Sequence, residues 1–324
     1  MVEERETWLV TGGAGYIGSH VVNEFLRNGK NVVVYDSLLS GLDSRINFLS
    51  KKYGREVKLI EGDIRDSQKL EKCMQEHQPL GIVHSAALKS VEESFKVPDE
   101  YMEVNFFATK DILQIATRMD IRNFVFSSTA AVYGSPNHSR LIKENDEKAP
   151  LSPYGNSKLL AEQEVERFSS LPDNNGVSLR FFNVVGSAAY ALRDNSTDNL
   201  VPKVLNRLLN GLSPIVFGND YPTPDGTCIR DYIDVRDIAT AHLSAANINS
   251  KLPFALNIGT NKGASVLEVI SLLKTITEAS HIPVVIAERR LGDPMALVAD
   301  TNLARAKLNF KARFQLSESI NTLI

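Results

Sequence analysis

The sequence predicts an α/β fold, in which a doubly wound parallel sheet forms the larger part and a smaller α/β lobe binds the substrate. Two observations indicate this class. Short apolar segments alternate with amphipathic segments as far as residue 183, and a glycine-rich turn directly follows the first apolar segment. Short buried strands separated by helices of roughly ten or more residues are typical of βαβ units, whose ligands bind at the carboxyl ends of the strands.

The individual elements follow from this alternation. The apolar segments that predict strands lie at residues 8–10, 32–35, 57–60, 81–84, 124–126 and 177–182. The amphipathic segments that predict helices lie at residues 16–28, 66–77, 100–119 and 154–170. Because right-handed crossovers join such units, these segments are expected to build one open sheet with helices on both faces.

The alternation changes after residue 183. Glycine, proline, asparagine and aspartate cluster at 194–202 and 218–227, which predicts loops between short helices. Residues 231–235 and the helix expected at 236–246 are interpreted as a return to the main sheet. The sequence ends within a predicted amphipathic helix. The predicted dinucleotide-binding domain comprises residues 1–183 and about 228–250, and the predicted substrate lobe comprises about 184–227 and 251–324.

Composition excludes several other classes. The 324 residues include 36 Lys and Arg against 39 Asp and Glu, and the net charge of −3 predicts neither a nucleic-acid-binding nor a membrane-binding surface. The polar start at residues 1–6 lacks the features of a signal peptide, and no apolar run is long enough to span a bilayer. Cys73 and Cys228 are interpreted as ordinary thiols of a reducing cytosol, and the histidines show no metal-ligand spacing. No metal is expected.

Residues 11–18 carry the pattern of a dinucleotide-binding turn. Gly12 permits the tight turn, Gly15 lets backbone N–H groups approach a pyrophosphate, and Gly18 lets the following helix pack on the sheet. The amino end of that helix adds a favourable field for an anion. A glycine triplet alone is weak evidence, but here a strand precedes it and a helix follows it, as the Rossmann pattern requires.

An acidic residue ends the second predicted strand. Asp36 lies about 20 residues after the glycine turn, which is the spacing of a carboxylate that binds the adenosine ribose. Such a carboxylate would repel a 2′-phosphate, so NAD is favoured over NADP. Alternatively, Asp36 and Ser37 form a helix cap or a turn. Asp63 ends the third strand in the same way and, followed by Ile64, is expected near the adenine end.

A tyrosine and a lysine are predicted to share one face of a helix. Ser152 and Pro153 provide its cap and first position, so Tyr154 and Lys158 lie one turn apart. A phenol with its usual pKa near 10 is a poor base, and a neighbouring ammonium, helped by a positive nicotinamide, would lower that pKa. The pair could then remove a hydroxyl proton while hydride leaves the same carbon for NAD.

Thr129 follows the strand predicted near residues 123–128 and is the third catalytic candidate. Its hydroxyl can donate to one oxygen and accept from another, which suits a proton relay between a substrate hydroxyl and Tyr154. For Ser127 and Ser128, the alternative is that their hydroxyls only satisfy the end of the strand.

With these elements in place, the chain resembles the extended short-chain dehydrogenase/reductase family and, within it, the UDP-glucose 4-epimerase subgroup. The likeness covers nearly the whole sequence. Residues 217–233, which read Phe-Gly-Asn-Asp-Tyr-Pro-Thr-Pro-Asp-Gly-Thr-Cys-Ile-Arg-Asp-Tyr-Ile, form a long stretch specific for this subgroup. The other matching stretches lie at residues 11–20, 61–65, 88–91, 126–134, 152–158 and 182–183.

The resemblance implies a mechanism. Tyr154 removes the proton of the sugar 4-hydroxyl with Thr129 as relay, and C4 passes hydride to NAD. The 4-keto sugar then swings about its diphosphate link, and hydride returns to the opposite face. The resemblance also implies that Lys89 approaches the sugar or the diphosphate, and that Asn105 helps to hold Lys158 or the cofactor.

The same resemblance, together with the motifs above, assigns the binding residues. The residues expected to bind NAD are Gly12, Gly15, Tyr16, Ile17, Gly18, Asp36, Ser37, Asp63, Ile64, Ser85, Ala86, Ala87, Lys89, Asn105, Ser127, Tyr154, Lys158 and Phe182. The residues expected to contact the UDP-sugar are Lys89, Thr129, Tyr154, Asn183, Asn199, Leu200, Phe217, Arg230, Tyr232, Arg290, Asp293 and Leu297. Two arginines could supply the charge that pairs with the diphosphate, although either could instead form a surface salt bridge.

Several residues depart from the family pattern without removing an essential group. Phe181 and Val184 stand where the family has Tyr and Pro around Phe-Asn, and Ala108 stands where it usually has Gly. Leu297 stands where some relatives carry a bulky Tyr beside the sugar, so partial tolerance of a 2-N-acetyl group is expected. Alternatively, Leu297 only packs in a closed pocket.

The same residues bear on other functions. Related dehydratases and decarboxylases carry acidic residues after the threonine, whereas Ala130 and Ala131 can neither protonate a leaving hydroxyl nor deprotonate C5. Epimerisation of UDP-glucuronate, UDP-N-acetylglucosamine or a UDP-pentose stays open, as does a non-catalytic NAD-binding regulatory protein. The resemblance further implies a homodimer, in which the helices near 100–119 and 154–170 pair across a two-fold axis.

Overall fold

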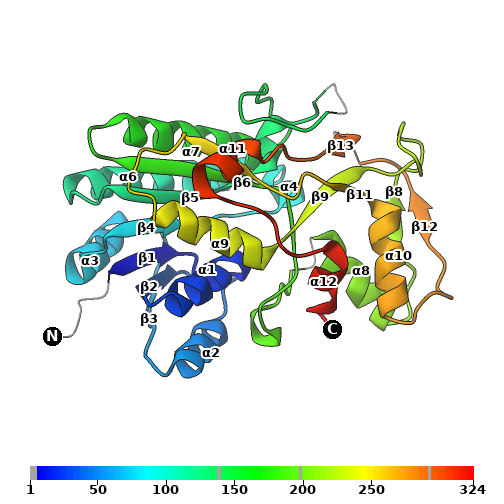
Figure 1. Cartoon of the computed structure of the whole chain (residues 1–324), viewed down its shortest axis with the longest axis horizontal. Helices are drawn as coiled ribbons and strands as arrows, with labels where there is room; N and C mark the ends of the chain where they lie inside the picture. The colour runs from blue at the N-terminus through cyan, green and yellow to red at the C-terminus, as the bar shows by residue number, and fades with distance from the viewer. Residues whose placement is uncertain (1–5, 137–139, 197–198, 291–292) are drawn as a thin grey trace.

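A seven-stranded sheet forms the centre of the computed structural model, which describes residues 6–136, 140–196, 199–290 and 293–324 (Figure 1). Its strands run in the order β10-β6-β5-β4-β1-β2-β3, and every neighbouring pair is parallel. The strands are β1 (Thr7–Thr11), β2 (Asn31–Asp36), β3 (Lys58–Glu61), β4 (Gly81–His84), β5 (Asn123–Thr129), β6 (Asn175–Phe181) and β10 (Ala255–Ile258). Because the chain order reverses beside β1, the sheet is doubly wound, and the predicted fold class is confirmed.

Helices cover both faces of this sheet. Trp8 and Val10 of β1 point into one apolar core, and Leu9 points into the other, as the alternation of side chains along a strand requires. The first core is covered by α1 (Tyr16–Arg27), α2 (Asp43–Tyr53), α9 (Val235–Ala246) and α11 (Asn302–Leu308). The second core is covered by α3 (Ser67–His77), α6 (Ala108–Arg118) and α7 (Pro153–Ser170).

The connection between β4 and β5 contains an irregular helix. After α4 (Val91–Ser94), α5 (Pro98–Met102) leads into a π-helical turn, η1 (Glu103–Phe107), which continues directly into α6. Single π turns within α-helices occur frequently at functional sites. The helix predicted at 100–119 is therefore present, with Asn105 inside its irregular turn.

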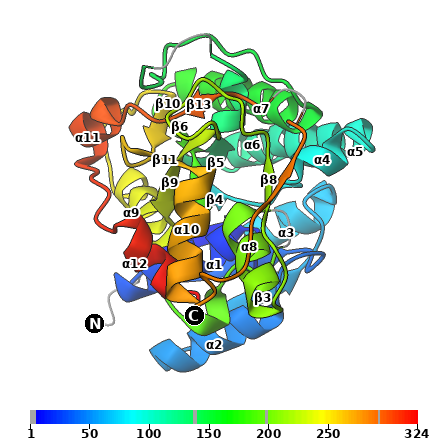
Figure 2. The ribbon, with the colours of Figure 1, turned by 90° about the vertical axis from the view of Figure 1, so that its right-hand side faces the viewer.

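The smaller region is built from short strands and three helices. A four-stranded sheet contains β7 (Asn183–Val185), β9 (Ile229–Asp234), β11 (Gly263–Ser265) and β13 (Ala296–Leu297), and a two-stranded sheet contains β8 (Ile215–Phe217) and β12 (Val285–Ala287). The helices are α8 (Leu200–Leu209), α10 (Val266–Ile276) and α12 (Leu316–Asn321). They enclose a third core that includes Val204, Val269 and Ile320, and α8 and α10 lie side by side in Figure 2.

Two elements differ from the sequence prediction. The expectation that residues 231–235 return to the main sheet is wrong, because β9 pairs with β7, β11 and β13 in the smaller sheet. Only α9, which follows β9, packs on the larger region, against α1. The seventh strand of the main sheet is β10, which lies in the range assigned to the second lobe. A short apolar segment does not encode which sheet it joins, and the division into two domains stays a prediction.

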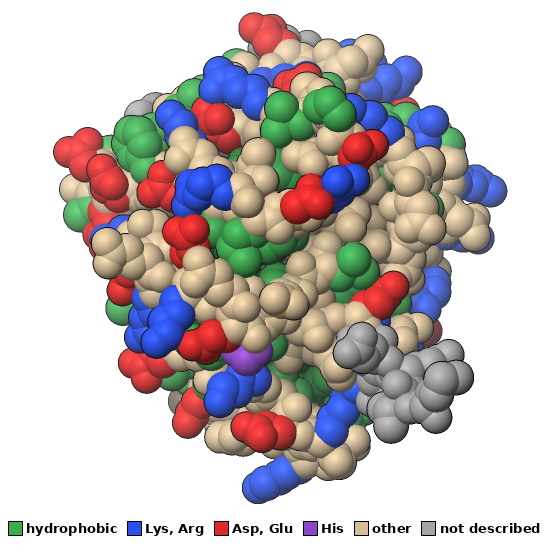
Figure 3. Space-filling view, turned by 90° about the vertical axis from the view of Figure 1, so that its left-hand side faces the viewer, with side chains coloured by type: hydrophobic (Ala, Val, Ile, Leu, Met, Phe, Trp, Pro, Cys, Tyr) green, Lys and Arg blue, Asp and Glu red, His purple; other side chains and the backbone are tan. Residues whose placement is uncertain are grey.

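Helix α2 was not predicted, because only Arg45, Ile46 and Leu49 of its eleven residues are buried. On the face shown in Figure 3, acidic and basic side chains are mixed over the surface. Within the ranges described above, no helix has the length and apolar content needed to cross a membrane. Residues 1–5, which form most of the polar start of the chain, lie outside the described residues.

Candidate active site

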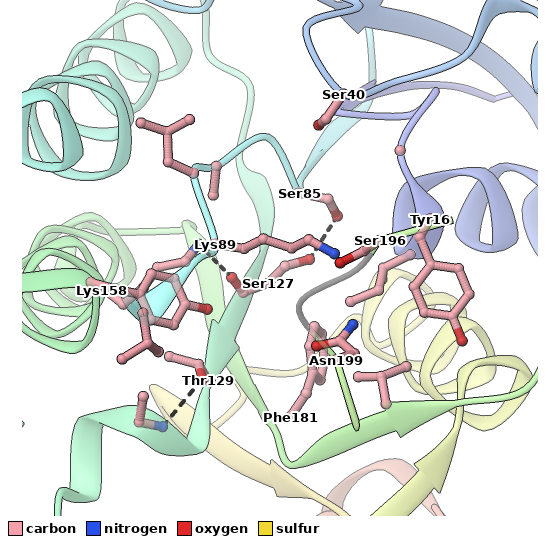
Figure 4. A pocket seen from close by; sticks show the side chains of 18 of the residues that line it. Tyr16, Ser40, Ser85, Lys89, Ser127, Thr129, Lys158, Phe181, Ser196 and Asn199 are labelled. Carbon is pink, nitrogen blue, oxygen red and sulfur yellow. Dashed lines mark hydrogen bonds between the residues drawn. The ribbon is translucent and has the colours of Figure 1, made fainter. Parts of the chain in front are cut away.

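A cavity of about 790 Å³ lies at the carboxyl ends of the central strands and extends into the smaller region (Figure 4). A cavity of this size is in the range of cofactor and ligand sites. Two proposed residues, Asn105 and Phe217, lie outside its wall. The proposed residues within the wall are Gly12, Gly15, Tyr16, Ile17, Gly18, Asp36, Ser37, Asp63, Ile64, Ser85, Ala86, Ala87, Lys89, Ser127, Thr129, Tyr154, Lys158, Phe182, Asn183, Asn199, Leu200, Arg230, Tyr232, Arg290, Asp293 and Leu297.

The glycine turn at the end of β1 accepts no side chain at its two outer positions. Gly12 has a positive φ of 69°, and a Cβ atom there would lie 2.5 Å from the backbone nitrogen of Ala86. A Cβ atom on Gly18 would lie 2.1 Å from the carbonyl oxygen of Gly12. Gly15 caps α1 with extended backbone. This close packing keeps the backbone of the turn at the cavity, where it fits the diphosphate of a dinucleotide.

Asp36 lies at the carboxyl end of β2 and is 6% exposed. Its Oδ2 accepts a hydrogen bond of 2.9 Å from the N–H of Ala14, and its Oδ1 accepts one of 2.9 Å from the N–H of Leu38. Burial raises the pKa of this carboxyl, and the backbone hydrogen bonds oppose the shift. Asp36 therefore forms a local turn with Leu38, fixes the glycine turn through Ala14 and lines the cavity. Its binding of the adenosine ribose stays a prediction.

Asp63 has a more exposed environment. Its carboxylate forms an ion pair with Arg65 at 2.6 Å, and both residues line the cavity. The hydrogen bonds from Arg65 lower the pKa of Asp63, so this carboxylate stays ionised.

Lys158 projects from α7 into a dry environment and is 3% exposed. Its ammonium donates a hydrogen bond of 2.9 Å to the carbonyl oxygen of Ser127 and lies 4.4 Å from the ring centroid of Phe126. Burial lowers the pKa of Lys158 to about 7, and the charge of Glu162 opposes this shift. The helix begins as predicted, since the Ser152 side chain accepts from the N–H of Gly155 and Pro153 occupies the first turn.

Tyr154 and Thr129 both line the cavity, and the Thr129 hydroxyl accepts a hydrogen bond of 3.2 Å from the N–H of Ala131. Burial raises the pKa of Tyr154, and the Thr129 hydroxyl opposes that shift. The expected lowering of this pKa involves the neighbouring ammonium together with a bound nicotinamide, and it stays a prediction; in the protein alone, the pKa of Tyr154 is raised. The physical reason is that desolvation disfavours both charged forms, the phenolate and the ammonium, and dominates at this site.

The two serines before Thr129 have partners within the fold. The Ser127 hydroxyl lies 2.6 Å from that of Ser85 and 3.0 Å from Nε2 of His242. The Ser128 hydroxyl donates to Glu162, which also forms a bidentate ion pair with the buried Arg180. Both serines line the cavity, and the hydroxyl of each is also engaged by other side chains of the fold.

Asn105 lies outside the cavity wall but contacts the backbone of a wall residue, Leu88. Its side-chain amide makes two hydrogen bonds of 2.9 Å to the backbone N–H and C=O of Leu88, and a third of 3.1 Å to the hydroxyl of Ser157. The side chain of Asn105 reaches Lys158 only through its neighbour Ser157, and the expectation that Asn105 helps to hold Lys158 or the cofactor stays a prediction. Asn105 fixes the residue before Lys89 and the residue before Lys158, because its π turn directs it between the two segments.

Two arginines line the part of the cavity where the UDP-sugar is expected, and each has a partner within the fold. Arg230 forms an ion pair with Asp293, and its other nitrogen donates to the carbonyl oxygen of Ile229 at 2.7 Å. The guanidinium of Arg290 stacks on the ring of Phe217, with 4.1 Å from Cζ to the centroid. Phe217 therefore supports a wall residue without lining the cavity itself.

Asp194 is a carboxylate of the cavity wall that the sequence did not single out. Asp194 accepts a hydrogen bond of 2.6 Å from the Asn199 amide, and its Oδ1 lies 3.8 Å from the ammonium of Lys89. Figure 4 shows Lys89 extending across the cavity towards Ser196, close to Asn199. The only sequence signal for Asp194 was its place in the predicted loop at 194–202, two residues of which, 197–198, lie outside the described residues.

Metal ligands and disulfides do not contribute in the described part of the chain. No group of three or more histidine, cysteine or acidic side chains could hold a metal ion there. Cys73 and Cys228 are both buried and free, and burial raises the pKa of Cys73 to about 11. Neither thiol is therefore activated as a nucleophile.

The fold and the cavity define the class of protein. A glycine turn and the carboxylate at the end of β2 share one cavity with a threonine, a tyrosine and a lysine, as in enzymes of the short-chain dehydrogenase type that use a nicotinamide dinucleotide. The chain belongs to the NAD dependent epimerase/dehydratase family, whose model matches residues 8–259.

Individual relatives agree over almost the full length. The UDP-glucose 4-epimerase of Yersinia enterocolitica is 38% identical over 319 residues, which cover 96% of this chain and 94% of the relative. A UDP-glucose-4-epimerase from Stenotrophomonas maltophila, solved with bound NAD and formylated UDP-arabinopyranose, has a TM-score of 0.90 at 36% identity and covers 98% of this chain and 97% of its own. The UDP-Glc/GlcNAc 4-epimerase of Campylobacter jejuni has a TM-score of 0.85 at 33% identity, with 98% and 97% covered.

Proposed function

We propose that this chain is an NAD-dependent 4-epimerase that interconverts UDP-glucose and UDP-galactose through a transient 4-keto sugar. The observation that carries the proposal is one continuous cavity. Its wall contains the glycine turn, which fits the cofactor, the side chains of Tyr154 and Thr129, and the arginines Arg230 and Arg290, which fit a second diphosphate. The relatives described above are named for the same reaction.

The side chains supply binding and proton transfer. When bound, NAD supplies the hydride acceptor for C4 of the sugar and a positive charge beside the tyrosine. Tyr154 takes the proton of the 4-hydroxyl and returns it to the product, with the Thr129 hydroxyl as relay. Lys158, fixed by the Ser127 carbonyl, favours the ionised phenol when it is itself charged. Arg230 and Arg290 anchor the diphosphate while the sugar turns.

The residues after Thr129 support epimerisation over elimination. Ala130 and Ala131 begin a short 3-10 helix, η2 (Ala130–Tyr133), and both line the cavity. Their methyl groups offer no acid or base to a leaving hydroxyl or to C5. The hydride removed from C4 therefore has no competing route to a dehydrated product.

Leu297 supports some tolerance of 2-N-acetyl sugars. It lies in β13, is 8% exposed, and lines the cavity within an apolar cluster that includes Ala130, Val132 and Phe182. Its side chain is smaller than the tyrosine that some relatives carry, so it leaves space beside the sugar. The relative from Campylobacter jejuni is named for both the UDP-Glc and the UDP-GlcNAc reactions.

One experiment tests these proposals together. The purified protein is offered UDP-glucose, UDP-galactose and their N-acetyl forms without added cofactor, and the products are separated by chromatography. We expect interconversion of the two hexoses and slower turnover of the N-acetyl pair. Tight NAD binding with no turnover of any UDP-sugar would favour the alternative of a regulatory protein.

A homodimer through α6 and α7 is part of the proposal. The two helices pack against each other, and Phe107, at the start of α6, is 43% exposed with its ring against that of Phe106. Such an apolar surface beside a helix pair suits a partner subunit. Sedimentation at micromolar concentration should give a dimer; a monomer would refute it. The two free thiols suit a reducing compartment such as the cytoplasm.

A further inference from the structure

Arg45 is a buried arginine beside the glycine turn that the sequence patterns did not single out. It lies on α2, is 3% exposed and forms part of the cavity wall. One terminal nitrogen donates to the carbonyl oxygen of Ala14 at 3.1 Å, and the other donates to the carbonyl oxygen of Arg193 at 2.7 Å. Its Nε is buried without a hydrogen-bond partner among the described residues.

The charge of Arg45 has no carboxylate in contact with it within the part of the chain that the structure describes. The acids that act on it from a distance are Asp194 and Asp36. Asp36 is engaged by backbone N–H groups, and Asp194 is engaged by Asn199 and Lys89. Burial accordingly lowers the pKa of Arg45.

A second buried arginine, Arg180, has the carboxylate partner that Arg45 lacks among the described residues. Arg180, 1% exposed, makes a bidentate ion pair with Glu162. A buried charge is stable when a counter-ion and hydrogen bonds compensate for the lost water, and its burial is costly otherwise. Arg45 has hydrogen bonds to two carbonyl groups but lacks a counter-ion among the described residues. An anion bound in the cavity would complete its environment.

We propose that Arg45 is a cofactor-retaining residue, whose buried positive charge is neutralised by the diphosphate of bound NAD. The inference rests on the proposed cofactor but not on the proposed reaction. Ala14 lies inside the glycine turn, so Arg45 is fixed at the place where that turn would hold the diphosphate. Lys158, Arg230 and Arg290 also line the cavity, but they are expected to serve the proton transfer and the substrate.

Arg45 also joins two segments that enclose this end of the cavity. The segment after β7 is tied to α1 by the Tyr16 hydroxyl, which donates to the carbonyl oxygen of Gly186 at 2.6 Å, and by His20, whose Nε2 accepts from the N–H of Ala188 at 3.0 Å. Arg45 ties the same segment, at Arg193, to the glycine turn. Loss of the diphosphate would leave this charge uncompensated, so the arrangement opposes cofactor release.

The test measures cofactor release instead of turnover. The enzyme is loaded with NADH, and the loss of bound-NADH fluorescence is followed after mixing with excess NAD. Replacing the charge in Arg45→Met should raise the dissociation rate roughly 30-fold or more, as expected for removal of one partner of a buried charge pair. Arg45→Lys, which keeps the charge but loses the two-pronged geometry, should fall between Arg45→Met and the wild type.

Arg55→Met is the matched control. Arg55 also donates to backbone carbonyl groups, those of Leu26 and Lys30, but it lies outside the cavity wall. Its replacement should leave NADH release unchanged. Thermal unfolding of the cofactor-free proteins separates binding from folding. Arg45→Met should unfold at the same temperature as the wild type or higher, because it removes an uncompensated buried charge.

Two results would overturn the proposal. One is an NADH release rate in Arg45→Met equal to that of the wild type. The other is a cofactor-free Arg45→Met protein that unfolds at a much lower temperature, with NADH adding as much stability as it adds to the wild type. Normal NADH retention in a wild-type protein that epimerises no UDP-sugar would count against the proposed reaction and leave the role of Arg45 standing.

Discussion

The two ends of the cavity are organised differently. At the end that contains the glycine turn, here called the cofactor end, the turn is fixed by close backbone packing and by hydrogen bonds to Asp36 and Arg45, and Arg45 is a buried cation in the cavity wall. At the substrate end, Arg230 is already paired with Asp293, and Arg290 stacks on Phe217. The cofactor end is therefore preformed, whereas a substrate diphosphate has to compete with a carboxylate for at least one arginine.

This difference agrees with the proposed cycle. A cofactor that is regenerated in every turnover gains from a site that holds it without rearrangement. A substrate that enters and leaves gains from cations whose charge is partly compensated while the site waits, because the penalty for an unpaired charge is then avoided. The proposed base, Tyr154, lines the same cavity as both groups of residues.

The largest expected effect is at that tyrosine. Tyr154→Phe should lower kcat by roughly 10²- to 10⁴-fold, because it removes the group that accepts the 4-hydroxyl proton. Retention of NADH should not change, since the glycine turn and Arg45 are intact. Thr129→Val, which removes the proposed relay hydroxyl and the acceptor of the Ala131 N–H, should have a smaller effect on kcat. An unchanged rate in Tyr154→Phe would show that another group is the base.

A bulky residue at the substrate end should change selectivity next. Leu297→Tyr should lower kcat/KM for UDP-N-acetylglucosamine roughly 10- to 200-fold relative to UDP-glucose, because the ring fills the space beside C2 of the sugar. Competition between the two substrates in one mixture measures the ratio directly. Equal losses for both sugars would mean that Leu297 supports the pocket without setting its size.

The ion pair between Arg230 and Asp293 tests most directly whether the two ends of the cavity differ in how their cations are compensated. Arg230→Met should raise KM for UDP-glucose about tenfold, because a charged hydrogen bond to the diphosphate is lost. Asp293→Asn, which frees Arg230 from its partner, should leave KM unchanged or lower it. If Asp293→Asn raises KM as much as Arg230→Met does, the carboxylate aligns the arginine and does not compete with the substrate.

The smallest effect concerns stability and pH. The pKa of Lys158 is about 7 in the folded protein against its usual 10.5, so between these values the unfolded chain binds a proton that the folded chain does not. The free energy of unfolding should therefore rise with pH across this window, and the cost of the buried charge is fully present below pH 7.

Lys158→Met removes that cost. It should stabilise the cofactor-free protein at pH 7 by about 1–2 kcal/mol, with the gain shrinking towards pH 10. Denaturant unfolding at several pH values measures this, and Lys72→Met, at a lysine whose side chain is 76% exposed, is the matched control. A gain that does not change with pH would show that packing, and not titration, is responsible.

Local patterns in the sequence were sufficient for the fold class, and together with the family resemblance they predicted site residues of which all but Asn105 and Phe217 lie in the cavity wall. The strand alternation, the glycine turn and the Tyr154–Lys158 spacing depend on neighbouring residues, and the structure keeps each of them. The placement of residues 231–235 was wrong, because pairing in a particular sheet depends on strands such as β7 and β11 that lie far away in the sequence.

The groups that the sequence did not identify act through partners distant in the chain. Arg45 lies on a helix with a weak pattern and bonds Arg193, and Asp194 is paired with Lys89. The raised pKa of Tyr154 could not be inferred from its spacing to Lys158, because burial depends on the complete set of neighbours. Sequence patterns located the chemistry, whereas the charge state of each group depends on the folded environment.

The π turn η1 determines the direction in which Asn105 points, and Asn105 fixes the backbone of Leu88, next to Lys89. Each residue added to or removed from a helix rotates the preceding part by about 100° relative to the rest of the helix. Deleting one residue from η1 to restore a regular helix would therefore swing Asn105 away from Leu88 and release the backbone next to Lys89, although no cavity residue had been replaced. The π turn η1 thus helps to set the orientation of the Leu88–Lys89 segment in the cavity wall.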